Sequence, residues 1–189
     1  MAKINYITDR NLFDDFDNDL ITCILYQEDT DFKSDRVLVK EGFAKALYQR
    51  YPKMHERLSR CFDAYSGQPK SIINNEMLGK ELDIRFDTNL EHTKHKYIFA
   101  LFTQEHKGEP SPLDNLFARN RRLVRILKDM NAAIDLKKHS VGMPLIGSGN
   151  AADPDIKRIH DYNKLSYFKD IVAPIIESSL GDFTVNVYC

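Results

Sequence analysis

Hydrophobic residues follow two different patterns along this chain of 189 residues. Dense runs of β-branched and aromatic residues are typical of strands, and they occur over 4–8, 20–26 (LITCILY), 96–104 (KYIFALFTQ), 139–147 (HSVGMPLIG) and 183–188 (FTVNVY). The runs over 20–26 and 96–104 are almost wholly apolar, which predicts central strands that are covered on both faces. A sixth segment, LDIRF over 82–86, alternates apolar and polar residues like a half-exposed strand.

Between these runs, apolar residues recur three or four positions apart, which predicts helices. One helix begins near Val39 and ends at Pro52, and a second carries the apolar residues of 54–65. A third begins at Ser111–Asp114, where serine can cap, proline fits the first position and aspartate favours the helix dipole. The last helix covers about 168–176, and Pro174 should kink or restart it.

Strands that alternate with helices predict one domain over 1–189 with a three-layer α/β/α sandwich and a mixed central sheet. In such sheets ligands bind at the carboxyl ends of the strands. This rule selects the loops after Tyr26, Phe102 and Ile146 as the places for chemistry.

Composition and charge limit the kinds of partner that the protein is expected to bind. Lys and Arg (27) nearly balance Asp and Glu (28), so there is no general charge reason to bind nucleic acid or an acidic membrane. The basic stretch 119–128 reads as a solvated helix face formed by Arg119, Arg122 and Lys128, without aromatic residues for base stacking. The N-terminus lacks the apolar block of a signal peptide, and no apolar run is long enough to span a membrane, so we expect a cytoplasmic protein with no membrane partner.

The three cysteines do not form a recognisable site. Cys23, Cys61 and Cys189 are far apart, and no pair has the spacing of a zinc site or a redox motif. Cys23 and Cys61 lie among apolar neighbours and are expected in the core. We expect neither a metal nor a cofactor.

The loop Gly147–Asp153 (GSGNAAD) follows a predicted strand and has two interpretations. Glycine and other small residues let backbone N–H groups approach a phosphate, as in anion-binding loops. The same residues are also common in plain turns. The loop is neither a Walker loop nor a dinucleotide fingerprint, because it lacks the GK[ST] ending and the third glycine.

Five segments occur in an order that resembles a known family. INYITDRNLF, LITCILY, EGFAKALYQRYPKM, KYIFALFTQ and VGMPLIGSG together resemble a macro domain, the ADP-ribose-binding module, over nearly the full chain. The likeness is greatest to stand-alone macro domains that include ADP-ribose-1''-phosphate phosphatases and small ADP-ribosyl hydrolases. The resemblance implies a domain that binds ADP-ribose or an ADP-ribosylated target.

The resemblance also implies a set of ligand-binding residues. Asp9 or Asn11 would hold the adenine amine, and Gly42 would let the backbone approach the distal ribose. Pro144 and Ile146 would set the exit of the loop, and Tyr167 or Phe168 would stack beside the adenine or ribose, although Phe168 also fits an apolar helix face. The remaining residues implied at the site are Tyr26, Gln27, Gln104, Gly147, Ser148, Gly149, Asn150 and Ala151.

Catalysis is a separate question. The resemblance makes Asp153 a candidate base and His106 a candidate acid or phosphate contact, with Lys40 and Glu41 bordering the reactive loop; each is also compatible with an ordinary surface position. The loop over 26–41 is longer and more charged than the family pattern. In the family this loop surrounds the reactive ribose, so the difference bears on catalysis more than on binding. The resemblance therefore leaves open a hydrolase, a non-catalytic binder of ADP-ribose, and a macro-like domain that contacts another protein.

Overall fold

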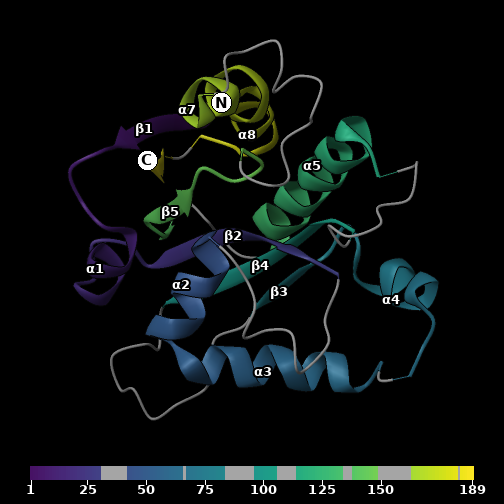
Figure 1. Cartoon of the computed structure of the whole chain (residues 1–189). Helices are drawn as coiled ribbons and strands as arrows, with labels where there is room; N and C mark the ends of the chain where they lie inside the picture. The colour runs from purple at the N-terminus through teal and green to yellow at the C-terminus, as the bar shows by residue number, and fades with distance from the viewer. Residues whose placement is uncertain are drawn as a thin grey trace.

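The structure is a computed structural model, which describes residues 1–30, 42–65, 67–83, 96–105, 114–133, 138–148, 163–182 and 184–189. A six-stranded sheet in the order β1-β6-β5-β2-β4-β3 forms its centre (Figure 1). The strands are β1 (Lys3–Ile7), β2 (Cys23–Asp29), β3 (Glu81–Asp83), β4 (Tyr97–Gln104), β5 (Val141–Pro144) and β6 (Thr184–Tyr188). Five strands are parallel and only β3, at one end of this sheet, is antiparallel, so the predicted mixed sheet is confirmed.

The central strands are those with the densest apolar runs. In β2 the residues from Cys23 to Tyr26 are fully buried, and β4 is buried from Ile98 to Phe102. The predicted start of β2 at Leu20 is wrong. The N–H groups of Leu20 and Ile21 donate to the backbone oxygen of Asp15, so these residues close the preceding helix instead of joining the sheet.

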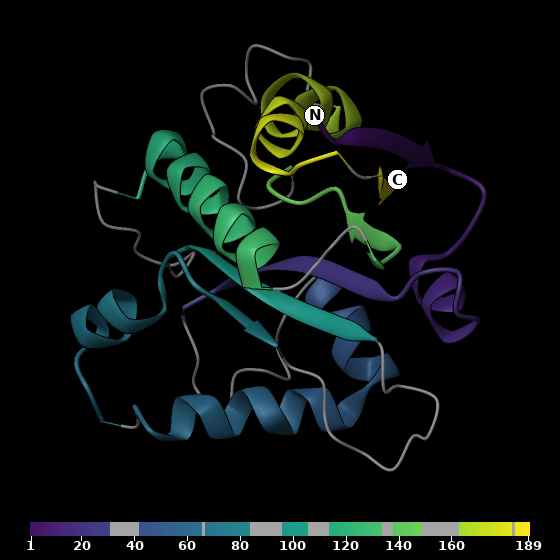
Figure 2. The ribbon, with the colours of Figure 1, turned by 180° about the vertical axis from the view of Figure 1, so that it is seen from behind.

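Helices cover both faces of the sheet (Figures 1 and 2). One face carries α1, α2 and α3, and the other carries α5 and the C-terminal helices. The helices are α1 (Leu12–Asp17), α2 (Gly42–Arg50), α3 (Pro52–Asp63), α4 (Lys70–Met77), α5 (Leu116–Ala133), α7 (Lys164–Tyr167), the π-helix η4 (Phe168–Val172) and α8 (Ala173–Ser179). The described residues contain no helix long and apolar enough to cross a membrane.

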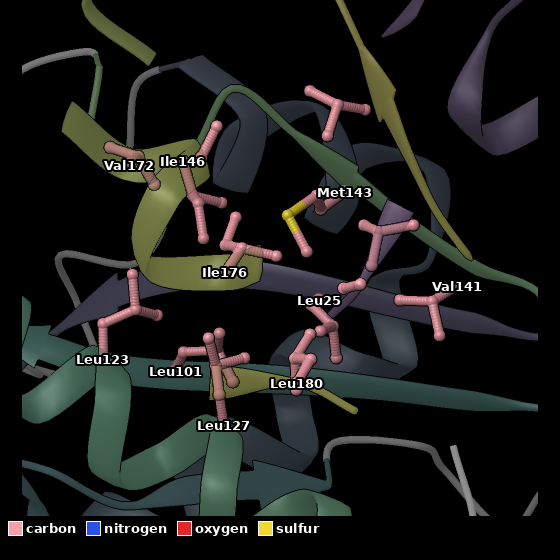
Figure 3. Close-up of a cluster of buried hydrophobic side chains, with 14 of the residues drawn as sticks. Leu25, Leu101, Leu123, Leu127, Val141, Met143, Ile146, Val172, Ile176 and Leu180 are labelled. Carbon is pink, nitrogen blue, oxygen red and sulfur yellow. The ribbon is translucent and has the colours of Figure 1, made fainter. Parts of the chain in front are cut away.

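Each face of the sheet has its own hydrophobic core. Leu25 of β2, Leu101 of β4 and Met143 of β5 pack against α5, η4 and α8 (Figure 3). On the opposite face, Ile24 and Ile98 pack against side chains of α1, α2 and α3. Strand alternation therefore divides β2 and β4 between two cores, as expected of strands in the middle of a sandwich.

Of two predicted helix boundaries, one differs from the structure and one is confirmed. The helix expected to begin at Ser111–Asp114 begins at Leu116, where the Asn115 side chain accepts a hydrogen bond of 3.0 Å from the Ala118 N–H. Asp114 precedes the helix and is buried (Ser111–Leu113 lie outside the described residues). Pro174 restarts the last helix as predicted, since α8 begins at Ala173 directly after the π-helix η4.

Lys96 joins the start of β4 to the end of α1. Its side chain is buried, and its ammonium donates to the backbone oxygens of Phe16 (2.5 Å) and Asp17 (3.5 Å) and pairs with Asp19. These carbonyls belong to the last turn of α1, where intrahelical partners run out; the Phe16 oxygen also accepts from the Asp19 N–H at 3.3 Å. A short helix that the sequence pattern did not predict is thereby fixed from outside.

Replacing Lys96 should therefore loosen α1. We expect Lys96→Met to lower the free energy of unfolding by about 1–3 kcal/mol, because buried carbonyl groups lose a charged donor. Urea denaturation measures this change. Lys53→Met, on the exposed start of α3, is the matched control and should change stability by no more than about 0.5 kcal/mol; equal effects of the two substitutions would contradict the role given to Lys96.

Candidate functional site

The parallel strands place the predicted loops along one edge of the sheet. β2, β4, β5, β6 and β1 all run in the same direction, so their carboxyl ends lie at the same edge. Asp29 at the end of β2 is paired with Gln104 at the end of β4, and the Thr30 N–H donates to the Gln104 oxygen at 3.3 Å. The loop after β5 starts at the same edge, beside the end of β2.

The loop after β5 is a tight turn. The Ile146 N–H donates to the Pro144 oxygen at 2.7 Å, and the buried Ser148 hydroxyl donates to the Leu145 oxygen at 2.6 Å. Gly147 has φ of +72°, a conformation that only glycine adopts readily. A Cβ at this position would lie 3.2 Å from Cγ2 of Val172, so both conformation and space select glycine here.

The Gln27 side chain connects this turn to the two central strands. Its Nε2 donates to the Thr103 hydroxyl at 2.5 Å, and its Oε1 accepts from the Gly147 N–H at 2.8 Å. One amide group thus links β2, β4 and the loop after β5. Gln27 and Gly147, both predicted at the site, are brought into direct contact.

A small cavity lies beside this amide bridge. Its volume of about 20 Å³ is enough for one water molecule. The lining is mostly apolar and comes from β2, β4, α5, the loop after β5 and the C-terminal helices: Gln27, Leu101, Thr103, Leu116, Arg119, Asn120, Leu123, Ile146, Gly147, Tyr167 and Val172.

The aromatic candidates of the last helix are buried. Tyr167 and Phe168 both have 0% exposure and belong to the core between α5, α8 and the sheet. Tyr167 lines the cavity, whereas Phe168 packs edge-on against Tyr6 at 6.3 Å between ring centroids. Neither ring is exposed to solvent in this conformation, so the structure does not present either ring for stacking on a ligand.

Tyr26 lies on the opposite face of the sheet, inside the core. Its hydroxyl is 2.9 Å from that of Tyr48 on α2, and Tyr48 in turn donates to the Glu28 carboxylate at 2.5 Å. Burial, followed by the negative charge of Glu28, raises the pKa of Tyr48 well above its usual value. The sequence pattern did not indicate this buried hydroxyl–carboxylate chain, since Glu28 looked like part of a charged loop.

The first turn of α2 lies beside the start of α1. Phe43 stacks on Phe13 with ring centroids 5.1 Å apart, and the preceding Gly42 has φ of +64°. Asn11 uses its side-chain oxygen to cap α1, accepting from the Phe13 N–H at 2.8 Å. Asp9 is exposed and receives no hydrogen bond from the residues that the structure describes, so of the two alternatives it is the one with a free acceptor.

Two arginines that the sequence pattern placed on a solvated face are instead anchored to a buried carboxylate. Asp114 has a fully buried side chain; it accepts from Arg119 at 3.1 Å, pairs with Arg122, and accepts from the Glu105 N–H at 3.1 Å. A carboxylate buried at this depth requires such partners. The prediction that Arg119 and Arg122 lie on a solvated face is therefore wrong. It considered only the spacing of residues along the helix and not the carboxylate of Asp114, which precedes the helix.

The remaining predicted residues are not placed. Lys40, Glu41, His106, Gly149, Asn150, Ala151 and Asp153 lie outside the described residues. Within the described part of the chain, no group of three or more His, Cys, Asp or Glu side chains could hold a metal ion.

Comparison with known proteins was made at the levels of sequence and structure. No protein-family model and no curated protein matches the sequence. Among solved structures, the macrodomain of Thermus aquaticus DarG matches with a TM-score of 0.59 and 17% identity, covering 100% of this chain and 99% of that one. A macrodomain protein from Streptomyces coelicolor matches with a TM-score of 0.56 and 16% identity, covering 99% of both chains.

This chain has the macrodomain fold. A further match is to Thermosipho africanus DarTG in complex with ADP-ribose, with a TM-score of 0.56 and 12% identity; it covers 100% of this chain and 42% of that one. The identities are low, so the likeness concerns the arrangement of the elements. The macrodomain resemblance inferred from the sequence segments is confirmed at the level of the fold.

The geometry of Gly147 predicts a measurable cost of substitution. Gly147→Ala should lower the free energy of unfolding by about 1–3 kcal/mol, through the positive φ and the close approach to Val172. In a double-mutant cycle, Val172→Ala should recover only the steric part of this loss. If Gly147→Ala is as stable as the wild type in urea denaturation, the turn does not have the conformation described.

Proposed function

We propose that this protein binds an ADP-ribose group, either free or attached to a modified target. The observation that supports the proposal most directly is the glycine turn at Gly147, held at the carboxyl edge of a sheet with the macrodomain fold. In open α/β sheets this edge is where ligands bind. The solved DarTG structure of the same fold was obtained in complex with ADP-ribose, which supports this class of ligand.

Individual residues have distinct proposed roles. Asp9, exposed after β1, would accept a hydrogen bond from the adenine amine. Gly42, where a Cβ would have no described atom within 4 Å, would let the ribose approach the first turn of α2. The loop that follows Ile146 would face the diphosphate.

The proposal predicts that ADP-ribose raises the melting temperature, because a ligand that binds only the folded state stabilises it. Asp9→Ala should raise the Kd for ADP-ribose about tenfold or more, through loss of a charge-assisted hydrogen bond. Calorimetry measures both proteins.

The matched control is Asp129→Ala. Asp129 is an exposed carboxylate near the end of α5, which runs from the carboxyl edge towards the amino edge of the sheet, and it is paired there with Arg125. Its substitution should leave the Kd unchanged. Absence of both binding heat and a melting shift with the wild type would rule out the proposed function.

Hydrolysis of the bound group remains a prediction from the resemblance. A carboxylate at Asp153 would activate water, so Asp153→Ala should abolish turnover while changing the Kd for ADP-ribose by less than about threefold. The assays follow phosphate released from ADP-ribose-1''-phosphate and ADP-ribose released from a modified protein. Binding without turnover by the wild type would establish the alternative, a non-catalytic ADP-ribose binder.

A further inference from the structure

The backbone amide of Gly147 already has a partner within the protein. Its N–H donates to Oε1 of Gln27 at 2.8 Å, which is good hydrogen-bond geometry. A loop that binds an anion does so through free N–H groups, and an N–H supplies one hydrogen. The N–H of the first glycine of the GSG sequence therefore already donates to a side chain of β2.

Gln27 is itself fixed in orientation. Gln27 is paired with Leu101, and Thr103 lies on the same face of β4, because side chains alternate along a strand. The Gln27 amide nitrogen donates to the Thr103 hydroxyl at 2.5 Å, which leaves its oxygen facing Gly147. If the amide were flipped, its NH₂ group would face the Gly147 N–H, and two donors cannot form a hydrogen bond. The observed orientation is therefore the one that satisfies both contacts.

The surroundings strengthen this bridge. The adjoining cavity is mostly apolar, and its volume is about 20 Å³. Hydrogen bonds are stronger in such surroundings, and losing a partner there costs more than it does in water. A substitution that keeps the volume of Gln27 but removes its polar atoms would leave the Gly147 N–H without an acceptor.

We propose that Gln27 is a positioning residue. Its hydrogen bond to the Gly147 amide fixes the conformation of the loop after β5, and Gln27 does not itself contact the ligand. The anionic part of the ligand is then met by donors other than this amide. The role in binding rests on the proposed ADP-ribose function, whereas the role in fixing the loop does not.

The first test uses the ligand-free protein. Hydrogen exchange followed by NMR should show a protected Gly147 amide in the wild type. In Gln27→Met, which keeps the side-chain length but has no comparable acceptor, the amide should exchange about tenfold faster or more. Gln27→Glu retains an acceptor and lets the Thr103 hydroxyl donate to it, so this variant should restore protection. Equal exchange in the wild type and Gln27→Met would overturn the proposal.

The second test distinguishes positioning from competition. If Gln27 positions the loop, Gln27→Met should raise the Kd for ADP-ribose about tenfold. If instead the ligand phosphate needs the Gly147 N–H, removing Gln27 would free that group and lower the Kd, which would overturn the proposal, as would an unchanged Kd. Gln49→Met, on the exposed end of α2, is the control and should leave exchange and affinity unchanged.

The two proposals can fail independently. A wild-type protein that does not bind ADP-ribose disproves the proposed function, and the exchange measurements still decide whether Gln27 fixes the loop. A wild type that binds, together with a Gly147 amide insensitive to Gln27→Met, disproves only the positioning role.

Discussion

The parallel pairing of β2 between β4 and β5 is the constraint on which the site depends. It brings the carboxyl ends of three strands together and places Gln27 beside Thr103 on one face. The loop after β5 then comes within reach of the Gln27 amide. A shift of β2 by one residue would turn Gln27 to the opposite face, so strand register determines whether the loop has its anchor.

Strong local patterns made much of the fold predictable. LITCILY and KYIFALFTQ are dense apolar runs, and such runs become central strands because both faces of a central strand must be covered. The run MPLIGSG ends in small residues, and the structure places a tight turn with positive φ there. The order of these segments was enough to indicate the macrodomain fold, although the sequence identities to solved macrodomains are below one fifth.

Contacts between distant residues were not predictable from spacing. Gln27 and Gly147 are 120 positions apart, and nothing local in either segment indicates their hydrogen bond. Glu28 reads as a loop charge, yet Tyr48 of α2 covers it inside the core. Arg119 fits the polar face of a helix by periodicity, but the buried Asp114 binds it. For Gln27 and Glu28 the partner lies on another element, and for Arg119 it lies in the turn before its own helix, which helical periodicity does not describe.

The pairing of β1 with β6 has a consequence for how the chain reaches its folded state. These strands join Lys3–Ile7 to Thr184–Tyr188, so the first and last strands of the described sheet, in chain order, are paired (Figure 1). Contacts of such long sequence separation form slowly because a large loop must close first. During synthesis β1 therefore has no partner in this sheet until β6 has been made, and in that interval its unpaired backbone N–H and C=O groups are open to pairing with another chain.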